Sequence, residues 1–225
     1  MPTSAIMVLT ATSRLFYPRV CRPRVQIMKT DTLPRKAEKK DEYWRSDAMA
    51  TIALPPAEPI RSLAVRLKNG LAIEDKREVQ TVCTAMLREL SSFYEVKSPT
   101  IKILSVRPLT VTEKWVDELF GEYDPESARI RLWMRTAVKK KATSYGVLLS
   151  TFCHEFFHHL DMVSLELPNT YHTRGFYQRV GLLYHHIQNT PVRTIVWLQE
   201  SNGTYRVDWA KTMAPSTASN SLSRR

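Results

Sequence analysis

Apolar positions with helical or strand periodicity define the middle of the chain. Between residues 74 and 94, apolar side chains recur at intervals of three and four, which predicts an amphipathic helix facing a core. The segment 100–106 alternates apolar and polar residues and stops before Pro108, as expected of a strand. The turn sequence Asp124–Ser127 separates two further short segments, so residues 121–134 are expected to form a β-hairpin.

The second half of the chain carries the strongest helical signal. A mostly apolar stretch over residues 145–167 follows the N-cap type Ser144 and is closed by Pro168, which predicts a long, buried helix. Another amphipathic helix is expected over residues 169–186, and residues 193–209 have the alternation of a second hairpin. These elements predict an α+β domain with a small antiparallel sheet packed against the long helix.

Composition divides the chain into three parts. The first 30 residues contain no acidic residue, a charge-mixed stretch follows, and a proline cluster lies over residues 54–59, where it interrupts any helix. We therefore expect a flexible basic N-terminal extension and linker over residues 1–56 and the folded domain over 57–210. Residues 211–225, rich in Ser, Thr and Ala, are expected to be a disordered tail.

The formal net charge of +11 raises the question of nucleic-acid binding. Residues 1–50 contain ten basic and five acidic residues, and residues 211–225 contain three basic and no acidic residues, so most of the excess charge lies in the expected tails. We therefore expect no more than weak DNA association, through these basic tails.

Other composition features exclude several classes of protein. No stretch approaches the roughly 20 apolar residues that span a bilayer, so no membrane partner is expected. Three cysteines without C-x-x-C spacing form neither a disulfide framework nor a cysteine zinc ribbon, which favours a reducing, cytoplasmic setting. Nothing in the composition indicates an oligomeric state.

Candidate metal chemistry lies in the predicted long helix. His154, Glu155 and His158 form the pattern H-E-x-x-H. On a helix, residues i and i+4 share one face, so the two imidazoles can bind one metal ion. Glu155 then lies beside the open coordination position, where a general base is needed.

A catalytic zinc site has three protein ligands and a fourth position for water, so a third ligand is required. His172 is favoured because it follows Pro168, where the chain can turn back over the helix. The alternative is Glu166, which on a continuous helix lies roughly 12 Å along the axis from His158. That distance is too long unless the helix ends early.

Three further polar residues are candidates for supporting roles. Asp161 shares a helix face with His154 and His158 and is expected to orient a ligating imidazole. Arg174 and Tyr177, on the helix after the third histidine, are the nearest candidates for stabilising an oxyanion. Two alternatives remain: Arg174 pairs with an acidic residue near the end of the long helix, Asp161 or Glu166, and Tyr177 is a core residue.

These residues resemble the SprT-like (Spartan-type) zinc metallopeptidases, in which the H-E-x-x-H helix is followed, after a loop, by H-G-x-x-F. Here that segment runs from His172 to Phe176, with Thr173 in place of the glycine. The likeness covers about residues 73–187 and includes a basic, apolar strand over 129–134. It implies a zincin-like fold and cleavage of DNA-associated proteins. No cysteine zinc ribbon follows, so a bacterial branch of the family is expected rather than Spartan itself.

The expected function is zinc-dependent hydrolysis of peptide bonds in a protein or peptide substrate. Zn²⁺ held by His154, His158 and His172 lowers the pKa of bound water, and Glu155 takes its proton and passes it to the leaving amine. The strand over 129–134 is expected to offer an edge along which an extended substrate pairs. Two alternatives remain: a nucleic-acid-associated protein that uses basic residues over 129–141, and a metal-binding interaction protein without catalysis.

Overall fold

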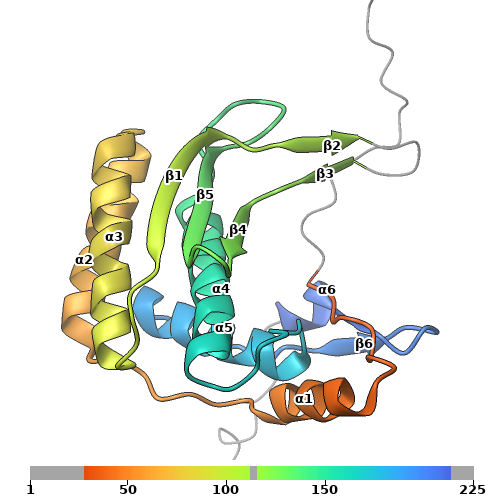
Figure 1. Ribbon diagram of the computed structural model, residues 1–225. Coiled ribbons are helices and arrows are strands. Elements are labelled where there is room, and N and C mark those ends of the chain that lie inside the picture. The colour runs from red at the N-terminus through yellow and green to blue at the C-terminus, as the bar shows by residue number, and fades with distance from the viewer. Residues whose placement is uncertain (1–27, 112–115, 214–225) are drawn as a thin grey trace, which may run out of the picture.

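A computed structural model describes residues 28–111 and 116–213 of the chain (Figure 1). Its elements form a mixed α/β architecture, as predicted. In chain order they are α1 Ala37–Ala48, α2 Ala57–Ala72, α3 Lys76–Phe93, β1 Thr100–Val106, β2 Leu109–Val111, β3 Val116–Glu118, β4 Gly121–Asp124, β5 Arg129–Arg135, α4 Tyr145–Val163, α5 Arg174–Gln188, β6 Trp197–Gln199, β7 Tyr205–Val207 and α6 Trp209–Thr212. Of the expected disordered tail over residues 211–225, residues 211 and 212 belong to α6, so this part of the prediction is wrong; residues 214–225 and residues 1–27 lie outside the described residues.

The central sheet has the strand order β1-β5-β4. The hairpin between β4 and β5 is antiparallel, as predicted, but β1 and β5 are parallel, so the sheet is mixed rather than antiparallel. The chain reverses direction between β1 and β4 and again between β4 and β5, which leaves β1 and β5 pointing the same way. β5 is therefore the central strand, and the prediction that residues 129–134 form an edge is wrong.

The two outer strands, β1 and β4, differ in whether another element covers the edge that faces away from β5. On β1, the Gln80 side chain of α3 accepts a hydrogen bond from the Ile103 amide at 2.8 Å and donates one to the Ile101 carbonyl at 2.9 Å. This helix therefore covers the edge of β1. Within the described residues, β4 pairs only with β5 and is the accessible edge strand.

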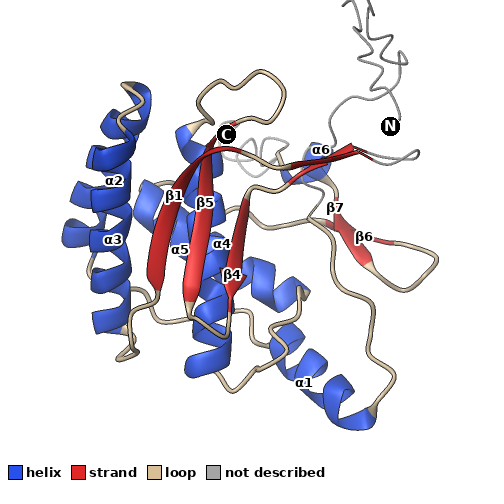
Figure 2. Ribbon diagram, turned by 45° about the horizontal axis from the view of Figure 1, so that its top comes forward, coloured by secondary structure: helices blue, strands red, loops and turns tan. Residues whose placement is uncertain are grey.

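The core lies between the sheet and the helices (Figure 2). α4 packs against β4 and β5 on one side and against α5 on the other, which explains why its sequence is apolar on nearly every face. α3 confirms the helix predicted from the stripe over 74–94. α2 was not predicted, because the proline cluster was interpreted as a linker; Pro59 lies in the first turn of α2, where a helix tolerates proline.

Residues 28–49, which we call the N-terminal segment, are part of the folded domain rather than a flexible linker. Lys29 forms a β-bridge with Arg206, and α1 packs against α5. Charged residues of the segment are paired within the fold: the Asp47 carboxylate accepts a hydrogen bond from the Arg174 amide at 2.9 Å. The structure differs from the sequence prediction here because the polar residues that suggested a solvated linker bind partners more than 100 residues away.

Gly175 in α5 is the point of closest approach to this segment. A Cβ atom added there would lie 2.2 Å from the Ser46 carbonyl oxygen and 2.6 Å from the Asp47 carbonyl oxygen. Only glycine fits without moving the end of α1.

Gly175→Ala is therefore expected to lower the free energy of unfolding by about 1–3 kcal/mol through overpacking. Gly181→Ala, in the same helix, is the matched control because a Cβ there meets nothing within 4 Å. It is expected to raise stability by about 0.5–1 kcal/mol, since alanine favours a helix over glycine. Urea denaturation of both variants measures the difference, and equal stabilities would contradict the close packing of α1 on α5.

Candidate metal centre

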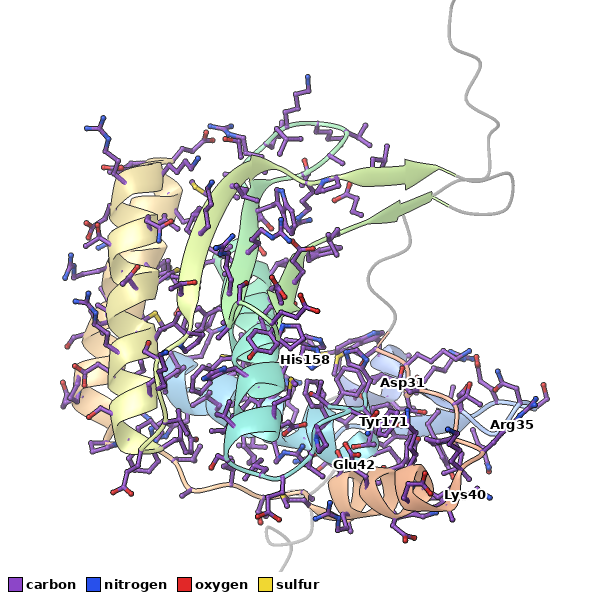
Figure 3. All side chains as sticks on the ribbon, in the orientation of Figure 1. Asp31, Arg35, Lys40, Glu42, His158 and Tyr171 are labelled. Atoms are coloured by element: carbon purple, nitrogen blue, oxygen red, sulfur yellow. The ribbon has the colours of Figure 1, made fainter. Side chains whose placement is uncertain are left out.

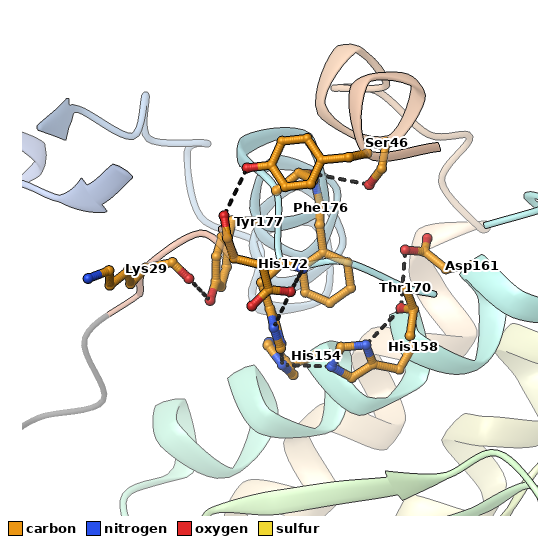
Figure 4. A network of polar contacts seen from close by, with 12 residues as sticks. Lys29, Ser46, His154, His158, Asp161, Thr170, His172, Phe176 and Tyr177 are labelled. Atoms are coloured by element: carbon orange, nitrogen blue, oxygen red, sulfur yellow. Dashed lines mark hydrogen bonds and ion pairs between the residues drawn. The ribbon is translucent and has the colours of Figure 1, made fainter. Parts of the chain in front are cut away.

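Three histidines from two elements converge at one place (Figure 4). His154 and His158 lie one turn apart on α4, and His172 comes from the loop before α5. The Nε2 atom of His154 is 3.0 Å from the Nε2 atoms of both His158 and His172. The structure thus brings together the three residues expected to bind metal.

The donor set fits a metal ion. Tetrahedral zinc with Zn–N bonds of 2.0–2.1 Å separates its nitrogen ligands by about 3.3 Å, close to the observed spacing. Burial, together with the neighbouring imidazoles, lowers the pKa of His154 well below its usual value, and burial lowers the pKa of His158 to about 3. Both rings are therefore neutral at pH 7, the form that coordinates metal.

Aromatic packing fixes the rings of the cluster. Phe176, fully buried on α5, stacks on His158 with a centroid distance of 4.8 Å and meets His154 edge-on at 5.0 Å. Because these contacts fill the space behind the imidazoles, the rings cannot turn freely away from one another.

A polar chain holds the outer nitrogen of His158. Its Nδ1 lies 2.8 Å from the Thr170 hydroxyl, which donates a longer bond of 3.4 Å to Asp161. Asp161 in turn accepts two hydrogen bonds from Arg179, at 2.9 and 3.1 Å, and both side chains are fully buried. The expected orienting role of Asp161 is thus exerted through Thr170 and not by direct contact.

Glu155 is buried and lies against the beginning of β4. Its Oε1 would be only 2.8 Å from a Cβ atom on Gly121, so the glycine allows this carboxyl group and the strand to approach closely. Burial, and secondarily the charge of Glu122, raises the pKa of Glu155 to about 8. In the metal-free protein the carboxyl group therefore holds a proton at neutral pH.

The segment between α4 and α5 settles which acidic or histidine residue completes the cluster. α4 ends at Val163, four residues earlier than predicted, and Glu166 is exposed with a φ of 54°. Its carboxylate is not among the groups that could share a metal ion with His154 and His158. The geometry thus selects His172 over Glu166.

α5 begins later than predicted, at Arg174, with Thr173 as its N-cap. The Thr173 hydroxyl accepts a hydrogen bond from the Phe176 amide at 3.0 Å and contacts the Ser46 hydroxyl at 2.9 Å. Residues 169–172 stay outside the helix because their polar groups bind the N-terminal segment and α4 instead. Because α5 begins only at Arg174, His172 lies in the loop before the helix.

The two candidates for oxyanion stabilisation have other partners. Arg174 pairs with Asp47, and its guanidinium lies 4.5 Å over the ring of Tyr205. The ring of Tyr177 stacks on His172 at 5.8 Å, while its hydroxyl donates to the Lys29 carbonyl at 3.0 Å. The single hydroxyl proton of Tyr177 is thus already in use and its ring is part of the core, whereas Arg174 pairs with Asp47 and not with Asp161 or Glu166.

Sequence reasoning missed three polar residues of the site: Asp31, Thr170 and Arg179. Arg179 had a usable signal, because it falls on the apolar face of a predicted helix, where a charge requires a buried partner. Asp31 had none, because it lies 141 residues before the histidine that it contacts.

No known protein family, curated protein or solved structure matches the chain. In the described part of the chain, no helix is long and apolar enough to cross a membrane.

The buried carboxyl group predicts a pH dependence for the metal-free protein. The unfolded chain loses the Glu155 proton near its ordinary pKa of 4.5, whereas the folded protein keeps it up to about pH 8. Raising the pH from about 5 to 8 therefore favours unfolding of the parent, and Glu155→Gln removes this contribution. The histidine contributions cancel in the comparison, because both proteins contain them.

Urea denaturation of chelator-treated protein at these two pH values measures the effect. The stability of Glu155→Gln relative to the parent is expected to increase with pH, whereas Glu126→Gln, on the exposed turn after β4, should follow the parent. A stability difference that is the same at both pH values would contradict the raised pKa.

Proposed function

We propose that the chain is a zinc-dependent metallopeptidase with a zincin-like catalytic domain, related to the SprT-like family. The observation that carries the proposal is the meeting of three imidazole Nε2 atoms from H-E-x-x-H and His172, with the buried Glu155 carboxyl next in sequence to the first histidine. A structural zinc site is normally closed by four protein ligands. Three ligands together with a buried carboxyl group next in sequence to one of them favour a catalytic site.

Zinc suits this ligand set because it accepts imidazole nitrogens in tetrahedral geometry. When bound, it supplies a Lewis acid that activates water and polarises a carbonyl group. A dication held by the three histidines would favour the ionised form of Glu155 and so lower its pKa from the metal-free value. Glu155 then accepts a proton from the attacking water and donates it to the departing amine.

The accessible edge of β4 supports a peptide as substrate. This strand begins at Gly121, against the Glu155 carboxyl group, and its side away from β5 is unpaired within the described residues. An extended peptide that adds to this edge by backbone hydrogen bonds would pass beside the proposed base. Because main-chain groups make these bonds, many sequences can bind in the same way.

The basic residues of the sheet give less support to a nucleic-acid-binding function. Arg131 pairs with Glu122 and Arg135 pairs with Glu74, so part of the positive charge between residues 129 and 141 is neutralised. DNA association through the chain ends stays a prediction, because most of those residues lie outside the described part of the chain.

Two substitutions separate metal binding from catalysis. His172→Ala removes one of three ligands and is expected to release zinc at much lower chelator concentration. Glu155→Gln keeps the shape of the side chain and removes the proton acceptor, so zinc should stay bound while hydrolysis falls by about 10² or more. His185→Ala, at the far end of α5, is the matched control and should retain both properties.

Zinc content by metal analysis and cleavage of labelled casein are measured on the same preparations. Stoichiometric, equally tight zinc in His172→Ala would show that the third ligand is a different residue. Cleavage by Glu155→Gln at the parent rate would refute the proposed mechanism even with zinc present. A parent protein that binds zinc without cleaving casein or other unfolded proteins would favour the metal-binding interaction protein.

A further inference from the structure

We infer that Asp31 is a positioning residue of the metal centre, supplied by the N-terminal segment to orient His172. The inference rests on the proposed metal site. Asp31 lies outside both α4, which carries H-E-x-x-H, and the loop between α4 and α5. Asp31 lies on the same side of the molecule as His158 and Tyr171 (Figure 3). In the proposed role it touches the ligand and not the metal.

The contacts between Asp31 and His172 fix both the backbone and the ring. The His172 amide donates to Oδ2 of Asp31 at 2.9 Å, and the Asp31 amide donates to the His172 carbonyl at 2.8 Å. The same Oδ2 lies 3.5 Å from Nδ1 of the imidazole. One carboxylate oxygen therefore faces both the amide and the outer ring nitrogen of this histidine.

This arrangement selects the tautomer that can bind metal. A carboxylate oxygen next to Nδ1 favours a proton on that nitrogen, which leaves the lone pair of Nε2 directed toward His154. His158 shows the same pattern, because its Nδ1 meets the Thr170 hydroxyl and its Nε2 faces His154. A carboxylate on the outer nitrogen also increases the basicity of the imidazole as a ligand.

Asp31 is itself held from two sides. The Tyr43 hydroxyl of α1 donates to the Asp31 carbonyl at 3.1 Å. The preceding residue, Thr30, donates its amide to the Tyr205 carbonyl of β7 at 2.8 Å. The position of the carboxylate is thus set by the packing of the whole N-terminal segment, so metal affinity should depend on residues more than 100 positions from the ligands.

The test compares Asp31→Asn with Asp41→Asn in the full chain. Both remove one negative charge from the N-terminal segment, but Asp41 is exposed on α1 and serves as the matched control. Asp31→Asn is expected to weaken zinc binding by about 10- to 100-fold in competition with a chelator. It should also shift the visible absorption bands of the Co²⁺-substituted protein, whereas Asp41→Asn should change neither.

A merely structural role makes a different prediction, which Tyr43→Phe tests. This variant removes the bond to the Asp31 carbonyl but keeps the carboxylate, so it loosens the segment without changing the charge beside His172. The zinc affinities of Asp31→Asn and Tyr43→Phe are compared with the melting temperatures of the same variants without metal. If the loss of affinity in both variants follows the loss of melting temperature, and the Co²⁺ bands of Asp31→Asn stay unchanged, the positioning role is refuted. Zinc affinity of Asp31→Asn within about twofold of the parent also refutes it.

These outcomes are distinct from failure of the proposed function. A parent protein that binds neither zinc nor Co²⁺ would refute the metal centre itself. A parent that binds zinc but does not cleave peptides leaves the role of Asp31 measurable, because the readouts are affinity and absorption.

Discussion

The ion pair between Asp161 and Arg179 is the interaction on which the geometry of the metal centre depends. Asp161 belongs to the H-E-x-x-H helix and Arg179 to α5, and both side chains are completely buried. The second guanidinium nitrogen, Nη1, also donates to the carbonyl groups of Ser46 and Met49, at 3.0 and 2.6 Å. A single side chain therefore connects α4, α5 and the end of α1.

Such a pair is costly to break. Removing one partner of a buried ion pair leaves an unpaired charge in a medium of low polarity, at a cost of about 3–5 kcal/mol. Because Asp161 lies three residues after His158 and also binds Thr170, a loss of this pair would disturb the first and second histidines as well as the loop that carries the third. The pair thus couples the stability of the fold to the geometry of the site.

Features that depend on residues close together in the sequence could be predicted, whereas features that depend on contacts between distant residues could not. The two helices of the H-E-x-x-H region and both predicted hairpins depend on periodicity and turns, and they were found. His172 was predicted because the histidine pair demands a third ligand and Pro168 allows a turn. Asp31, the N-terminal segment and the mixed sheet were not found, because long-range pairing decides them and a single sequence carries no record of it.

The N-terminal segment contacts residues that are synthesised much later, so its contacts form after those of the elements that lie between. Lys29 and Thr30 pair with residues of β7, and Asp31 with His172, so these contacts join residues that are 141 to 177 positions apart. On the ribosome, α2, α3 and the sheet can form while later residues are still being added. The histidine cluster and its Asp31 contact require His172, and the pairing of Lys29 and Thr30 with β7 follows only when residues 205 and 206 are available. A nascent chain that has not yet reached His172 therefore carries only two of the three proposed ligands, without the Asp31 contact.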